Sequence, residues 1–328
     1  MPKFSCSRAR AALSIAVLAL AFTISAPAQQ MVVTLIGTGG PELTADRSGE
    51  ATLIQANGQS LLFDAGRNVL DNLNRSHIPP QSIAKIFLTH LHSDHIAGLP
   101  DIWITPWFLL GRTTPLEIWG PVGTRAMVEG MHAMYAHDLE NRPNAALQRK
   151  GLDIIVHEIQ PGVVYQSGAV TVTATAVEHA DGDPAFAYRV VDDAHSVFLT
   201  GDCTLTPALL NAAASTSPDL LIANVAAGTT QHESDAHWKP VFAKLLTPEQ
   251  DAQLFTVARP RLAVFSHIVK KGLPRSAGDA VIIARTRRAG YRGRLMMGHD
   301  HTRIVIGKTI TISSVAGTAP ELDGTSSH

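Results

Sequence analysis

Apolar residues occur along this chain in short runs bounded by turn residues and in longer stretches with helical spacing. The short runs predict strands. In the first half they cover 31–36, 51–56, 60–64, 85–88 and 116–121. In the second half they cover 154–159, 170–177, 185–190, 196–200, 220–224 and 262–267, and the runs at 294–301 and 303–306 close the fold. Helical spacing predicts helices at 68–78, 123–138, 207–214, 247–258 and 279–289, with a helix or turn at 95–100.

The order of these elements predicts a layered α/β fold. Strands come first as a mostly antiparallel series with a helix inserted, and the same order recurs in the second half. Such an order favours two packed sheets with helices outside them. We find no tandem repeat and no linker that divides 29–328, so we expect one domain there.

The first 28 residues have the pattern of a secretory signal peptide. Lys3, Arg8 and Arg10 precede an apolar run of 13 residues, Ala11–Thr23, and Ala26-Pro27-Ala28 provides a small-residue cleavage site. The run is shorter than the about 20 residues that a membrane-spanning helix needs. We therefore expect a periplasmic or secreted protein with no stable membrane span after cleavage.

Composition and charge indicate a globular protein without an obvious polyanion partner. Hydrophobic residues make up 45% and charged residues 17% of the 328, which allows a sizeable core. The formal net charge is −1, and removal of 1–28 leaves 24 basic and 28 acidic residues, a net charge of −4. Without a basic surplus we expect no nucleic-acid partner. Cys203 is then the one remaining cysteine, so no intrachain disulfide can form.

The densest group of metal-capable side chains follows the predicted strand 85–88. His90, His92, Asp94 and His95 place four such side chains within six residues. Imidazole and carboxylate groups suit zinc and other borderline divalent ions. This density favours a metal site over a solvated polar loop.

Three further candidate ligands each follow a predicted strand: His179, Asp202 and His267. Functional side chains of layered folds gather where strands end in loops. Seven ligands that share one bridging carboxylate supply two four-coordinate centres. Asp64, at the end of the strand 60–64, is either a partner that orients a ligand histidine or a turn cap. The aromatic residues Trp103, Trp107 and Phe108 belong either to a pocket rim or to the core.

These motifs resemble the metallo-β-lactamase superfamily. The segment His90-x-His92-x-Asp94-His95 matches its signature, and the supporting segments are 34–40, 63–66, His179, 200–202 and 266–267. The Gly37-Thr38-Gly39-Gly40 start and the Gly201-Asp202 pair resemble its arylsulfatase and ribonuclease Z-like branch. The resemblance implies a four-layer αββα sandwich with a dinuclear metal site at one edge.

The resemblance also implies a division of the ligands between two metal ions. Site one would comprise His90, His92, His179 and Asp202, and site two would comprise Asp94, His95, Asp202 and His267. Asp202 would bridge the ions together with a hydroxide, and Asp94 could orient that hydroxide. Zinc is the default metal, with iron or manganese as alternatives.

The expected function is that of a dinuclear metal-dependent hydrolase acting on a small-molecule ester, with an aryl sulfate or a phosphodiester favoured. A lactonase or another carboxylic-ester or amide hydrolase is the alternative among enzymes, and a non-catalytic metal-binding module is the alternative outside them. The sequence leaves open the substrate, a homodimeric assembly and the leaving-group acid. The candidates for that acid are His232, His237, His299 and His301.

Overall fold

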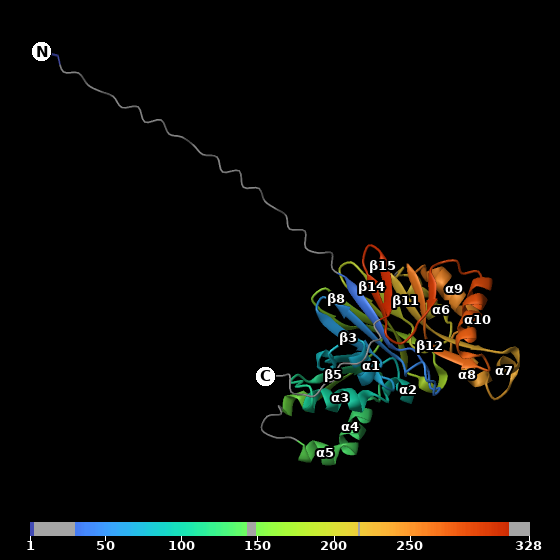
Figure 1. The fold of residues 1–328 in the computed structure, drawn as a ribbon, viewed down its shortest axis with the longest axis horizontal. Helices are drawn as coiled ribbons and strands as arrows, with labels where there is room; N and C mark the ends of the chain where they lie inside the picture. The colour runs from blue at the N-terminus through green and yellow to red at the C-terminus, as the bar shows by residue number, and fades with distance from the viewer. Residues whose placement is uncertain (3–29, 143–148, 216, 315–328) are drawn as a thin grey trace.

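A computed structural model describes residues 1–2, 30–142, 149–215 and 217–314 (Figure 1). The segment predicted to be a signal peptide, 1–28, lies outside the described residues except for its first two. That prediction and the periplasmic or secreted location therefore stay predictions. Within the described residues, no helix combines the length and the apolar character needed to cross a membrane.

The first sheet contains eight strands in the order β15-β14-β1-β2-β3-β4-β5-β6. From β15 to β3 the neighbouring strands are antiparallel, and from β3 to β6 they are parallel. The bounds are β1 Met31–Gly37, β2 Ala51–Ala56, β3 Gln59–Phe63, β4 Lys85–Phe87, β5 Leu116–Gly120, β6 Ile154–Glu158, β14 Thr302–Ile306 and β15 Ile310–Ser314.

The second sheet contains seven strands in the order β13-β12-β11-β10-β9-β8-β7. From β7 to β10 they are antiparallel, and from β10 to β13 they are parallel. The bounds are β7 Gly162–Ser167, β8 Val170–Val177, β9 Ala185–Val191, β10 Ser196–Leu199, β11 Leu220–Gly228, β12 Leu262–Lys271 and β13 Leu295–Met297. Each sheet is thus half antiparallel and half parallel.

Helices cover the outer face of each sheet (Figure 1). The first sheet packs with α1 Val69–Arg75, α3 Leu99–Phe108 and α4 Thr124–Met134 in one apolar cluster. The second packs with α6 Pro207–Ala214, α9 Pro248–Ala258 and α10 Arg275–Arg288 in another. A third apolar cluster lies between the two sheets. This arrangement confirms the predicted α/β sandwich of four layers.

Several elements differ from the sequence-based expectation. The prediction of mostly antiparallel strands is wrong for the parallel half of each sheet, because the helices between those strands act as crossovers that apolar periodicity alone does not reveal. The short strands β7 and β15 were not predicted, since their outward residues are largely exposed. The short helices α7 Thr230–Ser234 and α8 Lys239–Ala243 were not predicted either. The short helices α2 Ser93–Ile96 and α5 Ala136–Asn141 complete the set.

The aromatic residues after the histidine-rich motif mainly form core. Trp103 and Trp107 are 0% and 1% exposed, and the Trp103 indole donates to the Leu152 carbonyl at 2.9 Å. The pocket-rim interpretation is therefore excluded for both tryptophans. Phe108 is partly buried and packs against the same apolar cluster.

An aromatic stack at the centre of the sandwich offers a test of the core. The Phe87 ring lies between Phe63 and Trp119, with centroids at 5.0 and 4.8 Å, and contacts Tyr188 of the opposite sheet at 6.0 Å. We expect Phe87→Ala to lower the free energy of unfolding by about 3–5 kcal/mol, because it leaves a cavity where both sheets meet. Denaturant unfolding followed by circular dichroism measures this. Phe87→Leu is the matched control, and an equal loss for both variants would contradict the cavity explanation.

Candidate metal centre

The seven candidate ligands converge on one edge of the sandwich, where strands of both sheets end. His90 and His92 follow β4, and Asp94 and His95 lie on the single turn of α2. From the second sheet, His179 follows β8 and Asp202 follows β10. His267 lies within β12 at the point where its register with β11 shifts. The structure thus brings together all seven side chains that the sequence suggested.

One group of ligand atoms consists of three imidazoles. The His92 Nδ1 atom lies 3.0 Å from His90 Nε2 and 3.2 Å from His179 Nε2. His90 and His179 are buried, whereas the His92 side chain is 31% exposed. Solvent therefore reaches this group from the side of His92.

A second group contains Asp94, His95 and His267. The Asp94 Oδ2 atom lies 3.1 Å from His267 Nε2 and 3.7 Å from His95 Nε2. The Asp202 carboxylate joins the two groups, because its Oδ2 lies 3.6 Å from both His95 Nε2 and His179 Nε2. Its Oδ1 lies 3.1 Å from His267 Nδ1.

Three of these atoms are buried without a hydrogen-bond partner among the described residues: His95 Nε2, Asp202 Oδ1 and His267 Nδ1. Although Asp202 Oδ1 and His267 Nδ1 lie 3.1 Å apart, they do not form a hydrogen bond. Buried polar atoms that are left unsatisfied are costly, so their concentration at one point needs a ligand to satisfy them. Imidazole nitrogens and carboxylate oxygens facing a common centre fit divalent metal ions.

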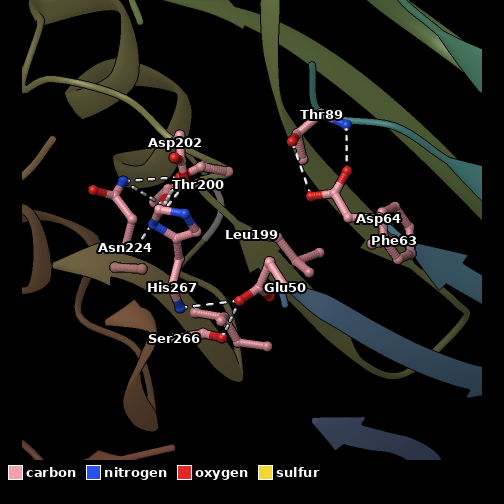
Figure 2. Close-up of a pocket in the computed structure, with 13 residues that line it drawn as sticks. Glu50, Phe63, Asp64, Thr89, Leu199, Thr200, Asp202, Asn224, Ser266 and His267 are labelled. Carbon is pink, nitrogen blue, oxygen red and sulfur yellow. Dashed lines mark hydrogen bonds and ion pairs between the residues drawn. The ribbon is translucent and has the colours of Figure 1, made fainter. Parts of the chain in front are cut away.

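The ligand imidazoles are held in place through their other nitrogens. Asp64 Oδ2 lies 2.8 Å from His95 Nδ1 and accepts the Thr89 hydroxyl at 2.9 Å, while Oδ1 accepts the Thr89 backbone N–H at 2.8 Å (Figure 2). The Nδ1 atom of His179 lies 2.9 Å from the Lys244 carbonyl oxygen. Such contacts fix the tautomer and orientation of a metal-binding histidine. Of the two interpretations of Asp64, the structure supports the orienting partner.

Glu50, which directly precedes β2, supports the site from the first sheet. Its Oε2 accepts the Ser266 hydroxyl at 2.6 Å and the His267 backbone N–H at 3.0 Å (Figure 2). Burial raises the pKa of Glu50 to about 7, against the opposing effects of the Ser266 hydrogen bond and of His267. The sequence did not suggest Glu50, because no ligand spacing connects it to β12.

Burial and mutual charge set the protonation of the ligands. Burial lowers the pKa of His90 well below its usual range, and the neighbouring His95 lowers it further, so this imidazole is neutral and can donate a lone pair. Burial alone would raise the pKa of Asp94, but His267 and His95 hold it below its ordinary value. Burial alone would also raise the pKa of Asp202, but His267 and His95 lower it below its ordinary value. Both carboxylates are therefore ionised at neutral pH.

Backbone conformation at the site is unusual in two places. His267 adopts a φ of 43°, a left-handed conformation that side-chain-bearing residues seldom take and that here accompanies a functional position. A Cβ atom on Gly182 would lie 2.2 Å from His179 and 3.0 Å from both His90 and His92. The residue after Asp181 must therefore be glycine for the loop to pack on the three imidazoles.

A small internal cavity of about 20 Å³ lies behind the ligands, and its lining includes Glu50, Asp64, Thr89, Asp202 and Asn224 (Figure 2). This volume suits about one water molecule. A wider groove of about 140 Å³ opens beside His92 and is lined by Leu91, Pro121, Val122 and 181–184. His92, one of the candidate ligands, also lines this groove.

The four histidines suggested as leaving-group acids lie outside the ligand groups. His232 Nδ1 contacts the Thr229 hydroxyl at 2.8 Å, and His237 packs against Trp238. His301 Nδ1 contacts the Ser76 hydroxyl at 2.9 Å, and His299 is exposed beside Arg47. The structure therefore does not bring any of the four to the ligand atoms.

The chain matches a known family model and the fold of solved structures. The family model described as "Beta-lactamase superfamily domain" matches residues 59–268. The metallo-beta-lactamase fold protein YhfI from Bacillus subtilis superposes with a TM-score of 0.64 at 19% identity, covering 84% of this chain and 100% of that one. Human tRNase Z, short form, superposes with a TM-score of 0.62 at 22% identity, covering 84% and 98%. These structures share the fold.

Curated relatives named ribonuclease Z match about half of this chain. The protein from Mycobacterium bovis (strain BCG / Pasteur 1173P2) is 36% identical over 173 residues, which is 52% of this chain and 62% of the relative. The protein from Mycobacterium sp. (strain KMS) is 37% identical over 188 residues, covering 56% and 65%. The chain thus spans less than two thirds of the length of these relatives.

The prediction of a small-molecule ester substrate with no nucleic-acid partner is wrong. The relatives that this chain matches are named ribonuclease Z, and that name, which denotes action on RNA in those proteins, conflicts with the prediction. The prediction relied on the net charge of the chain. Net charge is a sum over the whole surface and conceals local groups of cations, which are what a polyanion contacts.

Removal of the joining carboxylate tests the metal site. We expect purified protein to contain about two equivalents of divalent metal and Asp202→Ala to lose most of it while remaining folded, since Asp202 faces both ligand groups. Elemental analysis and circular dichroism measure the two properties. The exposed Asp193→Asn, in the turn between β9 and β10, is the control, and a single equivalent in the unaltered protein would contradict the two-ion arrangement.

The orienting role of Asp64 gives a second test. Asp64→Asn keeps the side-chain shape but weakens the contact to His95, so we expect metal affinity to fall about 10–100-fold. Competition with a chromogenic chelator measures the affinity. Asp300→Asn, which alters a partly buried hydrogen-bond acceptor at Thr38 and Ser48, is the control. Equal affinities for Asp64→Asn and the unaltered protein would exclude the orienting role.

Proposed function

Because this chain belongs to the β-lactamase superfamily, we propose that it is a metal-dependent hydrolase that cleaves phosphodiester bonds in RNA. The observation that carries the proposal is the convergence of seven ligand side chains from both sheets, with three of their atoms buried and unsatisfied. The similarity to proteins named ribonuclease Z supports a phosphodiester as the bond that is cleaved and RNA as the substrate. The convergence of the ligands and the similarity to these proteins both agree with an enzyme.

The ligand division of the proposal follows the two groups of atoms. His90, His92, His179 and Asp202 would hold one ion, and Asp94, His95, Asp202 and His267 would hold the other. We propose zinc, with iron or manganese as alternatives, because the ligand set suits all three. When bound, such ions act as Lewis acids and lower the pKa of water, which supplies a nucleophile at neutral pH.

The chain's own residues supply the remaining functions. The ionised Asp94 carboxylate can accept the proton of the attacking water. Asp64 and the Lys244 carbonyl keep His95 and His179 oriented. The Lys244 ammonium pairs with Asp181 at 2.9 Å, and Asp181 lies 3.9 Å from His92 Nε2. The Lys244–Asp181 ion pair thus borders the groove, which Asp181 and His92 both line.

We also propose that the protein acts in the periplasm or is secreted, on the basis of the signal-peptide pattern at 1–28. Its substrate would then be RNA outside the cytoplasm. N-terminal sequencing of protein recovered from the producing cells tests the cleavage after Ala28.

The proposed activity is tested with a labelled RNA oligonucleotide and with bis(p-nitrophenyl) phosphate as a probe for phosphodiester hydrolysis. We expect both to be hydrolysed, with p-nitrophenyl sulfate as the comparison substrate. Asp94→Asn should lower kcat by about 10²–10⁴-fold, because it removes the proton acceptor. Metal content is measured in parallel to separate this effect from metal loss. Hydrolysis of the sulfate but of neither phosphodiester would contradict the proposal.

A further inference from the structure

A group of exposed cations lies at the end of the second sheet that is opposite to the metal centre. We call it the arginine patch and define it by Arg259, Arg261, Arg288, Arg292, Arg294 and Lys308, all of which are exposed. They come from three separate segments that the fold brings together: 259–261, 288–294 and the β14–β15 turn.

The topology explains why these segments meet. α9 and α10 lie side by side against the second sheet (Figure 1) and end at Ala258 and Arg288, next to the starts of β12 and β13. The Ala263 backbone N–H donates to the Arg294 carbonyl at 3.0 Å, which joins the two strand starts. The Arg261 guanidinium donates to the Lys308 carbonyl at 2.7 Å and so brings in the β14–β15 turn.

The loop between α10 and β13 is held in a defined shape. The Arg287 guanidinium donates to the carbonyls of Tyr291 and Gly293 at 3.0 and 2.7 Å, and it lies over the Tyr291 ring. Arg292 in turn donates to the Arg287 carbonyl. The loop therefore presents Arg292 and Arg294 from a fixed backbone, which reduces the entropy lost on binding.

Few acidic groups offset this charge. Among the described residues, the one ion pair that involves the patch joins Arg261 to Asp219 at 2.7 Å. Within the same part of the chain, Arg259, Arg288, Arg292 and Arg294 form no ion pair. No ion pair among the described residues therefore neutralises these four guanidinium charges, although the net charge of the whole chain is only −1.

The distance from the metal centre sets the size of the partner. β12 runs from the patch to the site, and His267 follows Arg261 by six positions along the chain. At about 3.3 Å per residue, this is on the order of 20 Å. A ligand that contacts both places must therefore be a long polyanion rather than a short diester.

We propose that the arginine patch binds the phosphate backbone of the RNA substrate at a distance from the bond that is cleaved. The inference rests on the proposed function. Guanidinium groups form bidentate charge-assisted hydrogen bonds with phosphates. Phosphate contacts position a nucleic acid without reading its sequence, so the patch favours long or structured RNA over short fragments.

A variant with four substitutions tests the proposal: Arg259→Gln, Arg288→Gln, Arg292→Gln and Arg294→Gln in the mature chain. We expect kcat/KM for a long structured RNA to fall at least tenfold at physiological salt, and kcat/KM for bis(p-nitrophenyl) phosphate to stay within twofold. The slope of log affinity for RNA against log salt should become shallower by about 0.7 for each lost single-strand phosphate contact, hence by about 3 in total. Binding is measured on the metal-loaded protein by fluorescence anisotropy.

The matched control changes four exposed cations over the first sheet: Arg75→Gln, Arg125→Gln, Arg149→Gln and Lys150→Gln. An equal loss in this control would assign the effect to net charge and overturn the patch. An unchanged kcat/KM for RNA in the patch variant would overturn the patch and leave the proposed function intact. If the unaltered protein hydrolyses bis(p-nitrophenyl) phosphate but no RNA, the RNA function fails and the patch proposal fails with it.

Discussion

The Asp202 carboxylate, buried between two groups of histidines, is the feature on which the rest of the site depends. It is 4% exposed, and one of its oxygens has no hydrogen-bond partner among the described residues. Burying such a charge is costly unless opposite charge compensates it. The surrounding imidazoles compensate part of the cost, and the remaining deficit is what a divalent ion would satisfy. The site is therefore organised around a charge that the protein alone leaves incompletely balanced.

The layered fold makes this arrangement possible because the two sheets contribute different ligands. β4 and the turn after it bring His90, His92, Asp94 and His95 as one block, while the second sheet brings His179, Asp202 and His267 from three strands. The interlocking aromatic core between the sheets fixes their separation. Rigid packing matters here because a ligand set drawn from both layers keeps its geometry only if the layers cannot slide.

The candidate ligands that the structure brings together could be predicted from the sequence, and so could Asp64, whereas Glu50 and the Lys244 carbonyl, which also hold the site, could not. Each candidate ligand falls at or just after the end of a strand predicted from the sequence, and the six-residue motif concentrates four of them, so chemistry and position coincide in the sequence. Glu50 is different, because its contact with His267 joins residues 217 positions apart through sheet topology. The Lys244 carbonyl is a backbone group and carries no sequence signal. The parallel halves of the sheets were missed for a related reason, since the direction of a strand depends on the crossover that precedes it.

Charge shows the same contrast between composition and structure. A net charge of −1 suggested a protein with no affinity for polyanions, yet the fold separates its charges. The carboxylates of the site are buried among histidines, where they contribute little to the outer field. The arginines at the starts of β12 and β13 face solvent, where their positive charge attracts anions. A polyanion responds to this local potential and not to the sum. A chain can therefore be acidic in total and still present a surface suited to RNA. This requires that positively charged residues at the ends of helices and strands gather at one end of a sheet.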